Sequence, residues 1–218
     1  VGDEKQLPST VISVPAKDGG YGESMFDRLL KADYPHSLLN TQYRMHPDLS
    51  HFSRIEFYGG KVIDGENVTS CEYGQSWRGL FQQHLSLYDV SFGREETSLL
   101  GSKYNESEAA IVRQLAGVIR RQKEVKGPVS VGILSPYSEQ VKRLKHLEET
   151  SIVDGVKFRV CTVDGFQGQE SDIIIFTAVR SNEKARIGFL SDLRRLNVAI
   201  TRARFALIVV CNVRTVSH

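Results

Sequence analysis

Apolar residues recur along the chain in two different patterns, which predict strands and helices in alternation. Short apolar runs, typical of strands buried on both faces, lie at 129–134, 158–163, 172–179 and 206–210, with a weaker candidate at 37–40. Helical spacing of apolar residues predicts helices over 22–31, 47–57, 105–119, 135–147 and within 190–204. The range 58–103 is punctuated by glycines and predicts loops with a short hairpin.

Capping signals mark the starts of two of these helices. Asn105 followed by Glu108 forms a capping box, and Ser135 with Pro136 predicts an N-cap and the first helical position. Strands that alternate with helices predict an α/β fold with a mainly parallel sheet covered on both faces. Gly2-Asp3, Ser135 and Asp164 each follow a predicted strand, so we expect the candidate motifs to meet at one carboxyl rim of the sheet.

Composition, net charge and cysteine content narrow the class of protein. The chain has 218 residues, of which 40% are hydrophobic and 25% charged, which suits a folded protein of one to one and a half domains. The formal net charge of +2 argues neither for nor against a nucleic-acid ligand. Three widely spaced cysteines, no apolar run long enough to span a bilayer and no signal-peptide pattern predict an intracellular protein with reduced thiols.

Two arginines lie inside long motifs and have the chemistry that phosphoryl transfer requires. A guanidinium is always charged and presents a planar fork of donors to a phosphate. Arg44 and Arg202 are the candidates, and we expect Arg202 to be exposed at a cleft. The alternative for each is a surface arginine with an ion-pair partner. The motifs that contain them are Gln42-Tyr43-Arg44-Met45-His46-Pro47 and Leu196-Asn197-Val198-Ala199-Ile200-Thr201-Arg202-Ala203-Arg204.

These segments resemble motifs IV and VI of superfamily 1 helicases. A third segment between them, 162–170, resembles motif V, and the opening 1–8 resembles motif III. The resemblance is to the family that includes the nonsense-mediated-decay helicase and senataxin, and 57–68, 164–170 and 187–192 look most like senataxin. It implies a RecA-like fold and the second half of an ATP-driven nucleic-acid motor.

The resemblance also implies roles for individual residues at a nucleotide site. Gln6 would sense the γ-phosphate or its attacking water, and Arg44 and Arg202 would contact that phosphate as arginine fingers. Tyr43 would pack on the adenine, and Glu170 would hydrogen-bond the ribose hydroxyls. Gly168, in the turn before Glu170, completes the cofactor-binding set. Each residue also has a plainer alternative. Gln6 could cap a helix, and Tyr43 could be a core aromatic. Glu170 could pair with a lysine, and Gly168 could serve only a tight turn. Ser9 stands where many relatives carry a second proline, which we expect to leave the chemistry intact.

A nucleic-acid strand would be the second ligand. Hydroxyl groups near strand ends can donate to phosphates, an amide can do the same, and an aromatic ring can stack on a base. The candidates are Ser135, Pro136, Tyr137, Gln140 and Thr162. Ser135 could equally serve as an ordinary helix cap. The histidine spacing at 46–51 gives no reason to assign a metal site.

These observations predict that residues 1–218 form the second RecA-like domain of an ATP-dependent helicase, with a poorly defined stretch at 58–103. The ATP site would be completed by a first RecA-like domain, which carries the phosphate loop and most of the residues that bind Mg²⁺. The helicase would translocate on and unwind RNA, DNA or RNA–DNA hybrids, with single-stranded RNA or DNA as its bound partner, movement 5′-to-3′ and a nuclear location by resemblance. The chain alone is expected to be inactive. The alternatives are a helicase-derived binding module without turnover and an unrelated α/β nucleotide enzyme, which the lack of any phosphate loop here disfavours.

Overall fold

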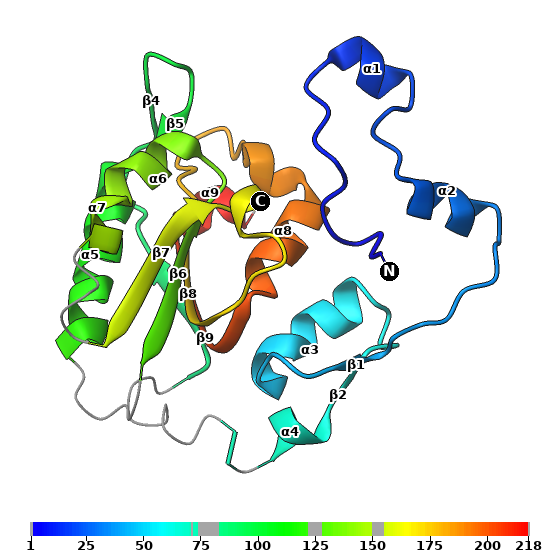
Figure 1. Ribbon diagram of the computed structural model, residues 1–218. Coiled ribbons are helices and arrows are strands. Elements are labelled where there is room, and N and C mark those ends of the chain that lie inside the picture. The colour runs from blue at the N-terminus through cyan, green and yellow to red at the C-terminus, as the bar shows by residue number, and fades with distance from the viewer. Residues whose placement is uncertain (1, 71, 74–82, 122–127, 150–154, 218) are drawn as a thin grey trace.

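The computed structural model describes residues 2–70, 72–73, 83–121, 128–149 and 155–217. Helices and strands alternate along most of this length (Figure 1). The helices are α1 (Val14–Asp18), α2 (Met25–Lys31), α3 (Pro47–Glu56), α4 (Glu66–Thr69), α5 (Glu106–Arg121), α6 (Ser138–Leu144), α7 (His146–Glu149), α8 (Leu193–Ile200) and α9 (Val213–Val216), with single 3₁₀ turns η3 (Asp164–Phe166) and η4 (Gly188–Ser191). The strands are β1 (Thr41–Gln42), β2 (Ile63–Asp64), β3 (Leu85–Asp89), β4 (Glu96–Thr97), β5 (Lys103–Tyr104), β6 (Val129–Ser135), β7 (Val156–Thr162), β8 (Ser171–Thr177) and β9 (Ala203–Cys211).

The main sheet has five strands in the order β3-β9-β8-β6-β7, and every pair in it is parallel. Its three central strands are buried almost throughout, as strands covered on both faces must be. The predicted α/β class with a parallel sheet is therefore confirmed.

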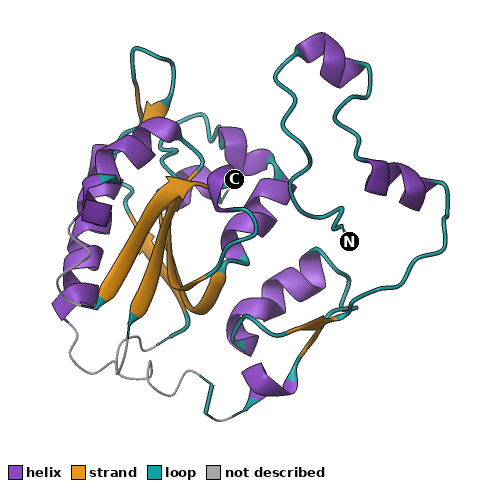
Figure 2. Cartoon of the chain, in the orientation of Figure 1, coloured by secondary structure: helices purple, strands orange, loops and turns teal. Residues whose placement is uncertain are grey.

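Successive residues of the central strands feed two separate cores, one on each face of the sheet. Ile133 and Ile175 point into a core shared with α5 and α6, whereas Leu134 and Ile174 point into a core shared with α3 and α8. Figure 2 shows these helices on opposite sides of the strands. The period-2 alternation of a strand produces this division, since neighbouring side chains leave a strand on opposite faces.

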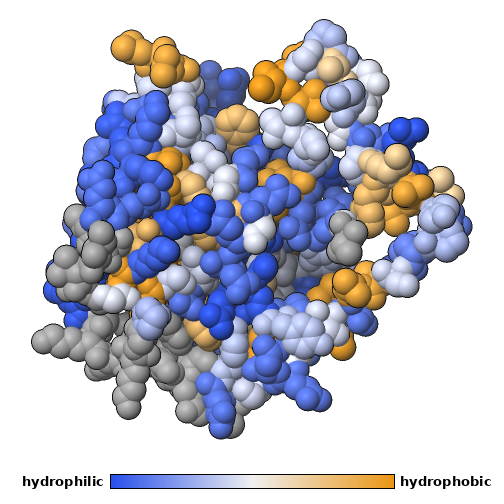
Figure 3. All heavy atoms as spheres, in the orientation of Figure 1, coloured by the Kyte–Doolittle hydropathy of each residue, from blue (hydrophilic) through white to orange (hydrophobic). Residues whose placement is uncertain are grey.

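Residues 9–40 run along the outside of the molecule, and none of them is buried. Helices α1 and α2 have no buried residue, and apolar side chains remain exposed along them, including Ile12, Val14 and Met25. Figure 3 shows apolar side chains gathered over this part of the surface. The predicted helix at 22–31 therefore forms, from Ser24 as N-cap, but its apolar stripe is not covered within the described chain.

Several local predictions differ from the structure. The strand expected at 37–40 is irregular backbone, and a two-residue strand begins at Thr41 instead. The hairpin expected within 58–103 is present as β4 and β5, but β3, an edge strand of the main sheet, was missed because its side chains are mostly exposed. Helix α6 begins at Ser138 with Tyr137 as N-cap, so Ser135 and Pro136 lie ahead of the helix rather than at its start. Proline fixes φ and has no backbone N–H, and Pro136 forms a bend between β6 and α6.

Cys161 and Cys211 are free thiols, as expected, and Cys71 lies outside the described residues. None of the helices in the described ranges has the length and apolarity that a bilayer crossing requires.

Candidate nucleotide and nucleic-acid sites

The loop that carries Arg44 is shaped by the side chain of Gln42. Its Oε1 accepts hydrogen bonds from the backbone N–H of Arg44 (2.9 Å) and of Met45 (2.8 Å). Its Nε2 donates to the carbonyl of Met45 (2.8 Å) and to Asp64 Oδ1 (2.6 Å). Gln42 is half-buried, and hydrogen bonds at both ends of its amide hold the loop in one conformation, so Arg44 leaves it in a defined direction.

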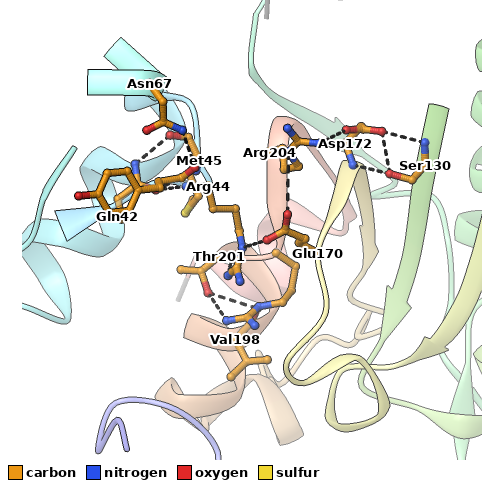
Figure 4. Close-up of polar contacts among 12 residues, drawn as sticks. Gln42, Arg44, Met45, Asn67, Ser130, Glu170, Asp172, Val198, Thr201 and Arg204 are labelled. Carbon is orange, nitrogen blue, oxygen red and sulfur yellow. Dashed lines mark hydrogen bonds and ion pairs between the residues drawn. The ribbon is translucent and has the colours of Figure 1, made fainter. Parts of the chain in front are cut away.

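Arg44 reaches across to the other side of the site. Its Nε donates to Glu170 Oε2 at 2.6 Å and its Nη1 donates to the carbonyl of Thr201 at 3.1 Å. Figure 4 shows this side chain extending from its own loop toward Glu170 and Thr201, with Arg204 on the far side of Glu170. Glu170 forms an ion pair, as its plainer alternative predicted, but its partner is Arg44 rather than a lysine.

Arg202 lies at the same place but is 2% exposed, which corrects the expectation of an exposed arginine. Its Nε donates to the carbonyl of Val198 (2.9 Å), and its Nη2 donates to Thr201 Oγ1 (3.0 Å) and Gln6 Oε1 (3.2 Å). Burial, and then the positive charge of Arg44, lowers the pKa of Arg202 to about 10. Arg44 and Arg202 thus place two positive charges near each other, an arrangement whose charge is suited to an anion.

The two remaining nucleotide candidates are arranged differently. Tyr43 is 65% exposed, and its ring lies so close to Gly65 that a Cβ there would come within 2.4 Å of Cδ1. An open ring face is what packing on an adenine requires. Gly168 has a φ of +78°, a left-handed conformation that favours glycine, and it turns the chain into Glu170.

Of the five strand candidates, Ser135, Pro136 and Thr162 lie at or beside the carboxyl ends of β6 and β7, and all but Pro136 and Thr162 are buried. Ser135 and Thr162 are register partners at the carboxyl ends of β6 and β7. Thr162 is half-buried and its Oγ1 accepts from the N–H of Gly165 (3.2 Å), while the Ser135 hydroxyl is buried and accepts from the N–H of Tyr137 (3.3 Å). Pro136 is half-buried between them and the start of α6.

Tyr137 and Gln140 lie in the interior. Gln140 is fully buried, accepts from the N–H of Asn105 (2.9 Å) and donates to Thr177 Oγ1 (3.1 Å). Tyr137 is 5% exposed, and its ring meets that of Phe189 edge-on with centroids 5.4 Å apart. Phe189 is 51% exposed. A base that approached this surface would therefore meet Phe189 first.

The two groups of candidates lie at opposite ends of the parallel strands. Ser135 and Thr162 end β6 and β7, whereas Glu170 and Arg202 directly precede β8 and β9. In an all-parallel sheet, the carboxyl ends of all strands lie on one side and the amino ends lie on the opposite side. The expectation that all motifs converge on one carboxyl rim was therefore wrong.

Three potential metal ligands lie within 4.8 Å of one another, on His46, Asp48 and His84. The two imidazole rings are stacked, with centroids 3.5 Å apart and planes inclined by 13°. Nitrogen lone pairs lie in the ring planes, so two stacked rings cannot both point at one ion. His84 Nδ1 instead bonds the carbonyl of Phe205 at 2.7 Å, which fits a structural clasp.

Comparison with known proteins accords with this geometry. A family described as “AAA domain”, carried by superfamily 1 helicases, matches residues 21–214. The chain belongs to that family.

Individual helicases of the family resemble the chain over almost its whole length. It is 41% identical to “Probable helicase MAGATAMA 3” of Arabidopsis thaliana over 99% of its residues, 40% identical to “Helicase sen1” of Schizosaccharomyces pombe over 99%, and 34% identical to “ATP-dependent helicase NAM7” of Saccharomyces cerevisiae over 100%. The chain spans 27%, 13% and 23% of those three proteins, respectively. It is thus part of a superfamily 1 helicase with a RecA-like α/β fold.

Three residues of this helicase domain join the sites without having been singled out from the sequence. Thr201 contacts both arginines, Phe189 covers Tyr137, and Tyr58 bonds Asp3. Thr201 and Phe189 lie inside segments that carry the family resemblance, so that resemblance was a usable signal. Tyr58 lies inside 57–68, another segment that carries the resemblance, so the same signal was available for it.

Proposed function

We propose that this chain is the second RecA-like motor domain of an ATP-dependent helicase that translocates on single-stranded RNA or DNA. ATP would bind between it and a first RecA-like domain, which supplies the phosphate loop and holds most of the Mg²⁺ ligands. Opening and closing of that cleft would drive stepping, 5′-to-3′ by family resemblance. A nuclear location follows from the same resemblance.

One observation carries the proposal. Gln6, Arg44, Glu170 and Arg202 are up to 196 residues apart in the sequence, yet hydrogen bonds join Arg44 to Glu170 and Arg202 to Gln6, and both arginines bond Thr201. Two guanidinium groups near the charge that develops on a γ-phosphate would stabilise the transition state. Mg²⁺ bound by the first domain would share that charge.

The exposed apolar side chains near the N-terminus support the first domain as a partner. Val14, Met25, Leu38 and Leu39 are each at least 60% exposed. An exposed apolar surface of this kind suits an interface with another domain.

The nucleic-acid strand would bind at the carboxyl ends of the β-strands, opposite the nucleotide site. Thr162 would face the phosphates, with Pro136 nearby, while the buried Ser135, Gln140 and Tyr137 would act through the shape of this rim. Binding of this type is directed at the backbone and tolerates many base sequences.

The test is ATP turnover by the protein that contains both RecA-like domains, with and without single-stranded RNA or DNA. Strand-stimulated turnover that Arg44→Ala abolishes supports the proposal. A protein that binds strands but hydrolyses no ATP would instead be the helicase-derived binding module, and an upstream sequence without a phosphate loop would agree with that outcome.

A further inference from the structure

Tyr58 forms two hydrogen bonds whose directions are fixed by their partners. Its hydroxyl donates to Asp3 Oδ2 at 2.8 Å, since a carboxylate accepts, and receives a hydrogen bond from Asn197 Nδ2 at 3.1 Å. Burial raises the pKa of Tyr58 to about 12. The phenol therefore keeps its proton near neutral pH and donates to Asp3 throughout.

Asp3 passes this constraint to Gln6. The same Oδ2 atom accepts a second hydrogen bond from Gln6 Nε2 at 2.7 Å. The other end of that amide, Oε1, accepts from Arg202 Nη2 at 3.2 Å. A guanidinium only donates and a carboxylate only accepts, so a flipped amide would lose both bonds. Gln6 is held in one orientation between Asp3 and Arg202.

The contacts continue into a closed ring. Arg202 Nη2 donates to Thr201 Oγ1 at 3.0 Å, and that hydroxyl donates to the carbonyl of Asn197 at 2.6 Å. Six residues thus form a circuit: Asn197, Tyr58, Asp3, Gln6, Arg202 and Thr201.

Asn197 is fully buried, and its Oδ1 has no partner within the described part of the chain. A buried acceptor without a partner costs about 1–3 kcal/mol. The residue is therefore better explained by its two donated bonds, to Tyr58 and to the carbonyl of Lys5 (2.9 Å), than by packing.

We propose that Tyr58 is a positioning residue for ATP hydrolysis: through Asp3 it holds the Gln6 amide, and that amide holds Arg202 in line for the γ-phosphate. This inference rests on the proposed function. Tyr58 touches no reacting atom in this scheme. It acts by limiting how far Gln6 and Arg202 can move, and displacements of about an ångström at such a site cost on the order of a hundredfold in rate.

The first experiment uses the full protein with both RecA-like domains and compares Tyr58→Phe with wild type. The variant keeps the ring and loses only the hydroxyl. We expect kcat for strand-stimulated ATP hydrolysis to fall by about ten- to a hundredfold, with KM for ATP and affinity for a single-stranded oligonucleotide unchanged within about threefold. Tyr104→Phe is the matched control, because its hydroxyl bonds Glu96 (2.8 Å) on the β4–β5 hairpin, outside the ring.

The second experiment separates positioning from general support of the fold. If Tyr58 acts through Gln6, the double variant Tyr58→Phe/Gln6→Ala will be no slower than Gln6→Ala alone. Asp3→Ala breaks the same link without altering the half-buried ring of Tyr58, and we expect it to reproduce the loss in kcat.

Two results would overturn the inference while the helicase function stands. One is a Tyr58→Phe protein that turns over ATP like Tyr104→Phe. The other is a double variant whose losses multiply, which means that Tyr58 acts independently of Gln6. A wild-type protein without strand-stimulated turnover gives a different readout, and it refutes the proposed function together with the inference built on it.

Discussion

Replacing Arg202 with alanine tests the candidate nucleotide site most directly. The side chain donates three hydrogen bonds and is 2% exposed, so its loss leaves the buried carbonyl of Val198 and the Gln6 amide each without one partner. Each such group costs about 1–3 kcal/mol, partly offset because the variant no longer buries a charge beside Arg44. We expect a net loss of about 1–3 kcal/mol in the free energy of unfolding and a fall in Tm of roughly 2–10 °C.

The effect on catalysis should be much larger than the effect on stability. Removing an arginine finger lowers turnover by about a thousandfold or more, which corresponds to roughly 4 kcal/mol of transition-state stabilisation. Arg202→Lys should fail as well, because a lysine has no planar fork with which to bond Val198 and Gln6 together.

The assay is strand-stimulated ATP hydrolysis by the full protein at a temperature well below Tm, with thermal melting of each variant in parallel. Arg113→Ala is the control, since Arg113 pairs with Glu106 on α5, within a different helix. Turnover by either Arg202 variant within about tenfold of wild type would refute the reasoning, and would leave Arg202 as a structural residue that ties α8 to the N-terminal segment.

Three further predictions follow from the same contacts. The purified 218-residue chain should hydrolyse no ATP, with or without a single strand, in a coupled ATPase assay. Phe189→Ala should weaken binding of single strands by the full protein by roughly 1–3 kcal/mol in a fluorescence titration, whereas Phe52→Ala, at a ring of equal exposure on α3, should not. Burial raises the pKa of Glu108 to about 7 from 4.5, so the folded chain holds that proton more tightly than the unfolded chain. Relative to Glu108→Gln, wild-type stability should therefore fall by about 3 kcal/mol as pH rises from about 4.5 to about 7, measured by urea denaturation at pH 4 and pH 8.

The sequence by itself determined where the central strands lie along the chain and which segments carry the motifs. β6, β8 and β9 were predictable because a strand covered on both faces is apolar along most of its length. β7 is an edge strand in which exposed Lys157 and Arg159 alternate with buried apolar residues, and that alternation made it predictable. The start of α5 after Asn105 was predictable for a similar reason, since Asn105 Oδ1 accepts from the N–H of Glu108 at 3.2 Å and capping depends on residues three apart.

The second half of the same capping box shows where local rules end. The Glu108 carboxylate does not return to the backbone of Asn105. It accepts from Thr177 Oγ1 (2.6 Å) and the N–H of Val179 (2.9 Å), while the N–H of Asn105 donates to Gln140. A buried carboxylate takes the strongest donors within reach, and here those belong to the end of β8, about seventy positions along the chain.

Only the tertiary structure decided where the two candidate sites lie and which side chains stay open. That Arg202 is buried against Gln6, and that Phe189 rather than Tyr137 meets solvent, depends on contacts between residues 52 and 196 positions apart. Local sequence patterns report the period of one helix or strand, which relates neighbours a few positions apart. The partners that satisfy a buried guanidinium, phenol or amide come from whichever elements the sheet brings alongside, so their identity is fixed only when the strands are in place.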